Sequence, residues 1–125
     1  DIHNAKSDTT VYTVVCDTPI EEVVTMMKKY DISQIPVVDD HGNLQGMVSE
    51  VDLLSHIVMS NGSYTKGDPV EAVVDENPTL VNPDDTLEAL LKVFNNKQVA
   101  VITKGRLIEG ILTKIDILDY LSSNL

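Results

Sequence analysis

The sequence is poor in cysteine and in aromatic side chains. Among its 125 residues it has one cysteine, Cys16, one phenylalanine and no tryptophan. A single cysteine excludes an intramolecular disulfide and a metal cluster built from cysteines, and it favours a reducing compartment. No apolar run approaches the roughly 18 residues that a membrane-spanning helix needs, and the N-terminus lacks the apolar stretch of a secretory signal. We therefore expect a cytoplasmic protein with no membrane partner.

Basic residues are also scarce. Lysine and arginine total 9 against 20 aspartates and glutamates, which gives a formal net charge of -11. Because no basic stripe is present to displace counterions from phosphates, we expect no nucleic-acid partner. The 42% of hydrophobic residues and 23% of charged residues are ordinary for a globular protein. The length suits one compact domain or two very small ones.

The sequence shows no arrangement of residues that would carry catalysis or bind a metal. His3, His41 and His56 lack the spacing of metal ligands; His41 fits a turn and His56 a solvated helix position. No Ser-His-Asp set, pair of catalytic acids or glycine-rich phosphate loop is present, so we expect no catalytic residue and no metal site. Cys16 has no basic neighbour in the sequence that would lower its pKa, so we expect an inert, packed thiol. The chain does not begin with methionine, and we expect it to be part of a longer protein whose catalytic domain lies elsewhere.

The most informative feature of the sequence is an internal repeat. The segment 34–52 recurs 64 residues later as the segment 98–116. Two copies suggest a pair related by a pseudo-two-fold axis, because a solenoid needs at least three. The apolar pattern that precedes each segment has a larger offset: Ile20 matches Leu87, 67 residues on. The second copy is therefore predicted to have lost three residues between this region and the strand that follows.

Each copy predicts the element order β-α-β-β-α, and hence an α+β fold. Short strands are expected at 11–15 and 79–81. Apolar side chains spaced i, i+3, i+4 and i+7 then predict a helix after Pro19, and a counterpart that carries Leu87, Leu90, Leu91 and Phe94. Two apolar runs around the turn 39–43 predict a hairpin in the first copy. A second helix closes each copy and is expected to bury these side chains: Leu53, Leu54, Ile57, Ile117, Leu118 and Leu121.

The two copies divide the chain into four expected parts. These are an N-terminal segment at 1–9, a first domain at 10–60, a linker at 61–68 and a second domain at 69–125. Asparagine, glycine and serine mark the linker as a loop. Asp68 and Pro69 are expected to cap a short helix that runs through Val74.

Both copies end a strand with the pattern Gly-x-x-[Ser/Thr]-x-x-Asp. The members are Gly46, Ser49 and Asp52 in the first copy and Gly110, Thr113 and Asp116 in the second. The glycine lets a ligand or a neighbouring backbone approach the strand closely. An ionised carboxylate only accepts hydrogen bonds, so it suits two adjacent cis hydroxyls such as those of a ribose. The alternative is a capping box, in which the hydroxyl and the acid satisfy only the first amides of the helix.

The repeat, with the segment IPVVD (35–39) and the motifs GMVSEVD (46–52) and GILTKID (110–116), resembles a tandem pair of CBS domains, the Bateman module. The resemblance covers about residues 10–122. It implies two β-α-β-β-α units packed as a pseudo-two-fold pair with two clefts. It also implies a regulatory, non-catalytic role in which the clefts bind an adenosyl ligand: AMP, ADP, ATP or S-adenosylmethionine.

The resemblance assigns site residues to both clefts. One cleft would hold the ribose with Thr113 and Asp116 and line the adenine pocket with Ile111. Its opposite wall would be formed by Ile32, Gln34, Ile35 and Pro36. The other cleft would combine Met47, Ser49 and Asp52 with Gln98, Val99 and Ala100. There Ala100 stands where the first copy has Pro36, and the three-residue loss shortens the wall, which puts binding at this cleft in question.

Within the CBS family, the chain looks most like the C-terminal regulatory region of cystathionine beta-synthases. The shortened segment 94–100, the segment 63–74 and the ending soon after Leu121 carry this likeness. It implies an attached catalytic domain that uses pyridoxal phosphate, no cofactor in this chain, and a homodimer. S-adenosylmethionine carries no phosphate, so an acidic module tolerates it better than ATP; Glu50 would repel phosphate, whereas Lys114 at the matching position would not. Two alternatives stay open: a ligand-free oligomerisation module, and an AMP- or ATP-sensing pair of another protein.

Overall fold

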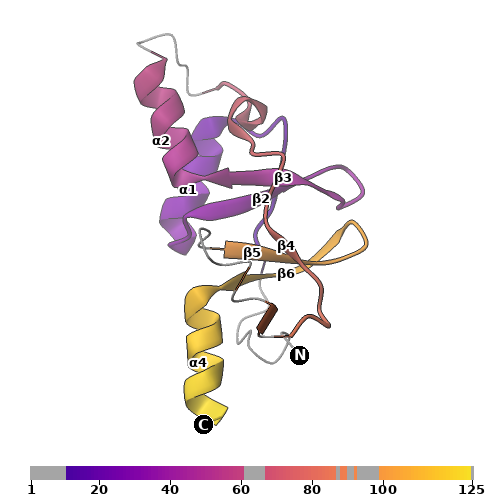
Figure 1. Cartoon of the computed structure of the whole chain (residues 1–125). Coiled ribbons are helices and arrows are strands. Elements are labelled where there is room, and N and C mark those ends of the chain that lie inside the picture. Colours follow the sequence, from indigo (N-terminus) through magenta and orange to yellow (C-terminus); the bar gives the residue numbers. More distant parts are fainter. Residues whose placement is uncertain (1–10, 61–66, 87, 90–91, 93–98, 125) are drawn as a thin grey trace. The chain divides into compact units, whose positions relative to one another are not determined.

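The computed structural model describes residues 11–60, 67–86, 88, 89, 92 and 99–124. Their internal contacts divide them into two compact units. We call Tyr12–Asn77 the N-terminal unit and the described residues from Pro78 onward the C-terminal unit. Figure 1 shows that each unit has a small sheet of its own.

The N-terminal unit has the predicted order β-α-β-β-α. Its elements are β1 (Val14–Val15), α1 (Ile20–Tyr30), β2 (Gln34–Val38), β3 (Leu44–Ser49) and α2 (Glu50–Met59), followed by a 3₁₀ helix (Val70–Val73). The strands form one sheet in the order β1-β2-β3, in which β1 runs parallel and β3 antiparallel to β2. Figure 1 shows β2 and β3 of this sheet.

The C-terminal unit repeats this sheet. Its elements are β4 (Leu80–Val81), β5 (Val99–Lys104), β6 (Leu107–Thr113) and α4 (Lys114–Asn124). The strand order is β4-β5-β6, again with one parallel and one antiparallel pair. The α+β fold is therefore confirmed. The four apolar residues of the predicted first helix of this copy, Leu87, Leu90, Leu91 and Phe94, lie outside the described residues.

Helix α1 forms because its apolar side chains recur on one face and its charges suit its two ends. Ile20, Val23 and Met27 are buried on that face. Glutamates occupy the first turn and lysines the last, which complements the helix dipole. The helix begins after Pro19 and ends at Asp31, whose φ of 53° is the left-handed conformation that closes many helices.

Each unit buries a core of its own. In the N-terminal unit, α1, α2 and the 3₁₀ helix pack on one face of the sheet, and their buried contributions include Ile20, Leu53 and Val70. In the C-terminal unit, Ile117 and Tyr120 of α4 pack against a buried cluster. That cluster consists of Val81, Ala100, Ile102 and Leu112.

The second helix of each copy buries fewer side chains than its periodicity predicts. The prediction of burial is wrong for Leu54, Leu118 and Leu121, whose side chains are 63%, 59% and 36% exposed. Leu53 is buried, as predicted, and Ile57 and Ile117 are partly buried. Because α2 carries apolar residues on two sides, the spacing alone does not decide which side faces the core.

The hairpin registers correct the alignment of the two copies. Pro36 lies opposite Met47 in the N-terminal unit, and Val101 lies opposite Ile111 in the C-terminal unit. Strands β3 and β6 keep the offset of 64, so β2 and β5 correspond at an offset of 65. The prediction that Ala100 takes the place of Pro36 is therefore wrong, because Val101 does. The physical reason is a hairpin loop that is one residue shorter in the second copy, so only two of the three missing residues precede β5.

The segment after the linker differs from the prediction. A four-residue 3₁₀ helix, Val70–Val73, stands in place of the predicted helix through Val74, and its N-cap, Pro69, makes no side-chain cap. Asp68 instead ties this segment to α1, because its carbonyl oxygen accepts a hydrogen bond from the Ile20 N–H at 2.8 Å. Residues 61–66, most of the predicted linker, lie outside the described residues.

Candidate ligand site

The junction between β6 and α4 forms a complete capping box. The N–H of Asp116 donates to Oγ1 of Thr113 at 3.2 Å, and the N–H of Thr113 donates to Oδ2 of Asp116 at 2.9 Å. Both side chains are partly buried. The capping interpretation is confirmed here: the hydroxyl and the carboxylate each satisfy a backbone amide that the helix itself leaves without a partner.

The junction between β3 and α2 forms only half of such a box. Ser49 is the N-cap of α2, and its Oγ accepts a hydrogen bond from the Asp52 N–H at 3.1 Å. The Asp52 side chain is exposed, and within the described residues no hydrogen bond to its carboxylate is present. The two copies therefore place the same residue types at the same junction, but only Asp52 keeps its carboxylate outside the cap.

Gly46 is required by the close approach of the chain's own backbone. A Cβ at this position would collide with the Val74 side chain and the Asp75 carbonyl oxygen. Asp75 pairs with Met47 at the outer edge of β3 through two backbone hydrogen bonds of 2.8 and 2.9 Å. The glycine of the motif permits the close approach of either a ligand or a neighbouring backbone. At Gly46 the structure shows a neighbouring backbone, that of Asp75.

Gly110 has no such neighbour among the described residues. A Cβ there would meet Ile102 Cδ1 at 3.5 Å, an ordinary van der Waals contact. In the part of the chain that the structure describes, β6 has β5 as its only strand partner. This glycine is therefore not explained by packing within the described C-terminal unit.

The remaining site residues predicted from the sequence fall into three groups. Partly exposed side chains, which a ligand could contact, are those of Ile32, Gln34, Val99 and Ile111. Buried side chains, which belong to the packing of the units, are those of Ile35, Pro36, Met47 and Ala100. Gln98 lies outside the described residues. The clefts that would combine the two units stay predictions.

Each hairpin brings the start of its first strand beside the hydroxyl of its own motif. Gln34 lies opposite Ser49, and Val99 lies opposite Thr113. The Glu50 N–H donates to the Ser33 carbonyl oxygen at 2.9 Å, which holds the loop before β2 against the start of α2. A predicted wall residue, Gln34, and a predicted ribose-binding motif are thus neighbours within one unit.

A small pocket lies beside Asp52. It has a volume of about 300 Å³ and is lined by Asp52, His56, Ala72, Val73, Val74 and Asp75. His56, predicted as a solvated helix residue, is partly buried and lines this pocket. Asp52 and His56 lie one helical turn apart, a spacing that is visible in the sequence. Asp75 lines the pocket only because it pairs with Met47 of β3, which the sequence does not show. Within the described residues, no three acidic, histidine or cysteine side chains are arranged to hold a metal ion.

The family model of the CBS domain matches residues 6–59 and 70–123, which covers most of the chain. The chain belongs to the CBS domain family. It is 30% identical over 123 residues to a CBS domain-containing protein of Dictyostelium discoideum, which covers 89% of this chain and 84% of that protein. It is 31% identical over 114 residues to the cystathionine beta-synthase of the same organism, which covers 87% of this chain and 22% of the enzyme.

Solved CBS structures share this fold. The structure of CBSX2 in complex with AMP has a TM-score of 0.77 and 23% sequence identity, and the match covers 91% of this chain and 89% of that chain. At this identity the likeness shows the fold alone. The chain spans only 30% of an uncharacterised Methanocaldococcus jannaschii protein and 22% of the Dictyostelium enzyme that it matches. Among the helices that the structure describes, none is both long and apolar enough to cross a membrane.

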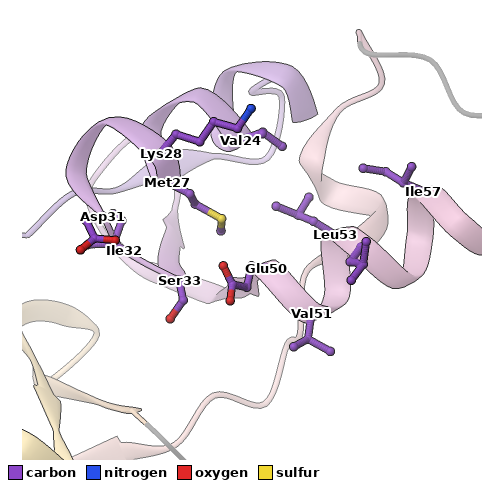
Figure 2. Close-up of a pocket in the computed structure, with 11 residues that line it drawn as sticks. Val24, Met27, Lys28, Asp31, Ile32, Ser33, Glu50, Val51, Leu53 and Ile57 are labelled. Atoms are coloured by element: carbon purple, nitrogen blue, oxygen red, sulfur yellow. The ribbon is translucent and has the colours of Figure 1, made fainter.

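The first CBS repeat also contains an apolar groove between α1 and α2, with a volume of about 700 Å³. Figure 2 shows Met27, Glu50 and Leu53 pointing toward its centre, with Lys28 and Asp31 at its rim. The lining residues are Val24, Met27, Lys28, Asp31, Ile32, Ser33, Glu50, Val51, Leu53, Leu54 and Ile57. Ile32, a predicted wall residue of a ligand cleft, thus contributes to this groove.

The thiol of Cys16 has the environment of a packed, unreactive group. It is partly buried, and burial raises its pKa, with further increases from the nearby carboxylates of Glu71, Asp17 and Glu76. The thiol therefore stays protonated at neutral pH, and a protonated thiol is a poor nucleophile. The prediction of an inert cysteine agrees with this environment.

The turn between β2 and β3 is organised by one side chain. Asp39 accepts hydrogen bonds from the N–H groups of His41 and Asn43, both at 2.9 Å, and from the side chains of Asn43 and Gln45. The backbone hydrogen bond from Asn43 is the main cause that lowers the pKa of Asp39 below its usual 3.8. The predicted hairpin turn is confirmed.

Proposed function

We propose that this CBS pair is a regulatory module that binds an adenosyl ligand at its glycine-hydroxyl-aspartate motifs. The observation that carries the proposal is the duplication: both repeats place a hydroxyl and an aspartate at the same strand-to-helix junction. A helix cap also places no demand on the glycine of the motif, yet Gly110 is not explained by packing within the described residues. CBSX2, a protein of the same fold, has been solved in complex with AMP.

The chemistry of the motifs suits a ribose. The Asp52 carboxylate is exposed, accepts no hydrogen bond within the described residues, and can therefore accept two from vicinal hydroxyls. Asp116 has two carboxylate oxygens, of which Oδ2 serves the cap. A ligand at Asp116 would share a carboxylate that the helix already uses, whereas a ligand at Asp52 would not.

We propose S-adenosylmethionine as the ligand on the side of Asp52. Asp52 and Asp75 are exposed carboxylates, and both line the pocket there. Two unit charges 4 Å apart interact by roughly 1–4 kcal/mol at effective dielectric constants of 80 to 20, which penalises a phosphate and favours a cationic sulfonium. Lys114 beside Thr113 makes the second repeat the more tolerant of AMP or ATP.

We further propose that the module acts as a homodimer and controls a cystathionine beta-synthase catalytic domain attached to it. The 31% identity to the Dictyostelium enzyme supports this proposal. The pyridoxal phosphate would be held by that catalytic domain, and no residue of this chain is assigned to it. Ligand binding could shift the activity of such a domain only if the ligand binds two conformations of the protein with different affinity. Coupling free energies of this kind are typically 1–3 kcal/mol.

A ligand-free structural module is the second candidate. The observation that favours it is the complete capping box at Thr113 and Asp116, which accounts for both side chains without a ligand. On this alternative, the motifs would be retained for helix stability alone.

Thermal unfolding of the chain distinguishes the two candidates. A ligand at one hundred times its dissociation constant stabilises the fold by about 2.7 kcal/mol. S-adenosylmethionine, S-adenosylhomocysteine, AMP and ATP are compared, because the second compound lacks the sulfonium charge. We expect the largest shift with S-adenosylmethionine.

Asparagine variants of the two motif aspartates show which repeat binds the ligand. Asp52→Asn and Asp116→Asn should each reduce the response of the site that they belong to. Asp119→Asn, an exposed residue one turn after Asp116 on the same helix, is the matched control and should retain the full response. No shift with any of the four compounds would contradict the ligand proposal and support the structural module.

A further inference from the structure

A pocket of about 480 Å³ lies at the turn of the β5–β6 hairpin, which Figure 1 shows in orange. Three carboxylates line it, those of Asp84, Asp85 and Glu109. One ammonium group, that of Lys104, also lines it, and Thr103 completes its polar lining at the end of β5. The pocket lies within the C-terminal unit and is separate from the glycine-hydroxyl-aspartate motif of that unit.

Thr103 brings to this pocket a buried polar group that the fold leaves without a partner. It is the one polar or charged side chain among the described residues that is buried, with 5% exposed. Its hydroxyl makes no hydrogen bond in the part of the chain that the structure describes, yet no polar atom closed off from solvent there lacks a partner. The hydroxyl is therefore reached from the pocket that Thr103 lines. Such burial costs free energy unless a ligand supplies the missing hydrogen bond.

The first repeat shows that the fold does not require this hydroxyl. By the strand registers, Val38 stands where the second repeat has Thr103, and Gln45 stands where it has Glu109. The carboxylate of Asp39 closes the first turn and accepts a hydrogen bond from Gln45. The buried hydroxyl and the carboxylate of Glu109 are therefore particular to the second repeat.

The two aspartates of the pocket lie in a turn that both repeats share. Asp85 Oδ2 accepts a hydrogen bond from the Asn82 N–H at 2.9 Å, and Thr18 Oγ1 accepts one from the Val15 N–H at 3.2 Å. A hydroxyl is thus enough to close this turn, and the carboxylate of Asp85 brings a second oxygen and a charge that the turn does not need. Within the described residues, no hydrogen bond or ion pair engages the Asp84 side chain.

The spacing of the carboxylates suits an organic cation. Within the described residues, no three acidic, histidine or cysteine side chains are arranged to hold a metal ion. The aspartates follow β4 and Glu109 lies on β6, and β5 stands between these strands. Two strand spacings separate their backbones by roughly 10 Å, so a ligand that reaches both sides has two positive groups joined by a short chain.

We propose that this pocket binds a small organic dication, with one ammonium group at Asp84 and Asp85 and the other at Glu109. An ammonium group has three hydrogen-bond donors and no acceptor, so the Thr103 hydroxyl accepts a hydrogen bond from it. Lys104 opposes binding, but the acids that line the pocket outnumber it three to one. The inference does not depend on the proposed adenosyl ligand.

The test is a titration with butane-1,4-diamine at constant ionic strength, followed by the amide resonances of the chain. We expect saturable shifts confined to residues 82–85 and 103–109. Butylamine, which has one ammonium group, should bind more weakly by a factor of about 1.4 to 5, the contribution of one exposed ion pair. 4-Aminobutyrate, in which a carboxylate replaces the second ammonium group, should bind more weakly still.

Variants of the lining residues test the contacts. Thr103→Val, which copies the first repeat, should weaken binding by roughly two- to tenfold, the net contribution of one hydrogen bond. It should leave the urea midpoint unchanged or raised, because no hydroxyl is then buried. Asp84→Asn and Glu109→Gln should each weaken binding by a factor of about 1.4 to 5, and Lys104→Gln should strengthen it by a similar factor.

A matched control separates the pocket from general attraction to an acidic chain. Asp17 is exposed and stands in the turn of the first repeat where the second has Asp84. Asp17→Asn makes the same change in net charge as Asp84→Asn and should leave the affinity for the diamine unchanged.

Three results would overturn the inference. Shifts spread over both units, or equal losses in Asp17→Asn and Asp84→Asn, would show only non-specific attraction between a cation and an acidic protein. Tighter binding of 4-aminobutyrate than of the diamine would mean that Lys104 holds a carboxylate and that the pocket takes a zwitterion. If Thr103→Val lowers the urea midpoint, the exposed variants decide, and full affinity in both Asp84→Asn and Glu109→Gln would exclude the site.

Discussion

The matched glycines Gly46 and Gly110 provide the sharpest test of the packing in the two repeats. Neither has a positive φ, so alanine is permitted by the backbone at both positions. At Gly46, the added methyl group would collide with Val74 and with the Asp75 carbonyl oxygen. At Gly110, it would meet only Ile102 at ordinary contact distance. The same substitution should therefore have opposite effects.

The magnitudes follow from the contacts. Overpacking costs about 1–3 kcal/mol, and the two hydrogen bonds between Met47 and Asp75 contribute roughly 0.5–1.5 kcal/mol each if they are lost. Gly46→Ala should destabilise the N-terminal unit by about 2–6 kcal/mol, the upper end applying if both hydrogen bonds are lost. Gly110→Ala should stabilise by roughly 0.4–1 kcal/mol, because alanine restricts the unfolded chain.

Urea unfolding monitored by circular dichroism measures both free energies, and amide exchange at Met47 and Asp75 reports whether their pairing is lost. A difference of about 3 kcal/mol corresponds to a separation of the two midpoints of more than 1 M urea. Equal midpoints for the two variants would refute the account of Gly46. If a ligand approaches β6 at Gly110, Gly110→Ala should also weaken the thermal shift with adenosyl ligands although it does not destabilise the fold.

Three further predictions follow from the site and its surroundings. Asp116→Ala should lower stability by about 1–2 kcal/mol, since it removes half of a capping box, whereas Asp52→Ala should change it by less than about 0.5 kcal/mol; urea unfolding compares them, and equal losses would contradict the difference in capping. The lowered pKa of Asp39 means that its contribution to stability is present above its unfolded value of 3.8 and is lost as the pH falls through the folded value. Asp39→Asn should therefore flatten the acid limb of the stability profile, and an unchanged limb would count against the turn network. The raised pKa of Cys16 predicts slow alkylation by iodoacetamide at pH 8, and faster alkylation in Glu71→Gln; equal rates would show that the carboxylate does not influence the thiol.

The sequence predicts the features that depend on local chemistry. The hairpin turn at Asp39, the N-cap at Ser49 and the box at Thr113 and Asp116 all follow from residue types at short spacing. Such interactions form between residues two to four positions apart, so the pattern contains both partners. The CBS fold is indicated by the resemblance of the repeated motifs to those of tandem CBS domains, and the family model confirms it.

Features that depend on distant segments are not predictable in this way. The alignment of identical residues at an offset of 64 joins Gln34 to Gln98, but a hairpin loop one residue shorter shifts β5 by one position. Because a strand alternates its faces with a period of two, that single residue decides which side chain replaces Pro36. Asp75 pairs with Met47 of β3, which lies 28 positions earlier in the sequence, and no local sequence pattern predicts this pairing.

The exposure of Leu54 and Leu118 has a different origin. Both helices carry apolar residues on two sides, and burial of one side in the core leaves the other as a surface. On α2 the exposed apolar residue Leu54 lies about 160° around the helix from Asp52, so the candidate ligand carboxylate and the exposed apolar side chains occupy opposite sides of one short helix. A ligand held by Asp52 could alter self-association only if it binds the paired and unpaired chain with different affinity. By thermodynamic reciprocity, dimerisation would then change the affinity for the ligand by the same factor. One coupling free energy could therefore be measured either from the effect of ligand on dimer dissociation or from the effect of dimerisation on ligand affinity.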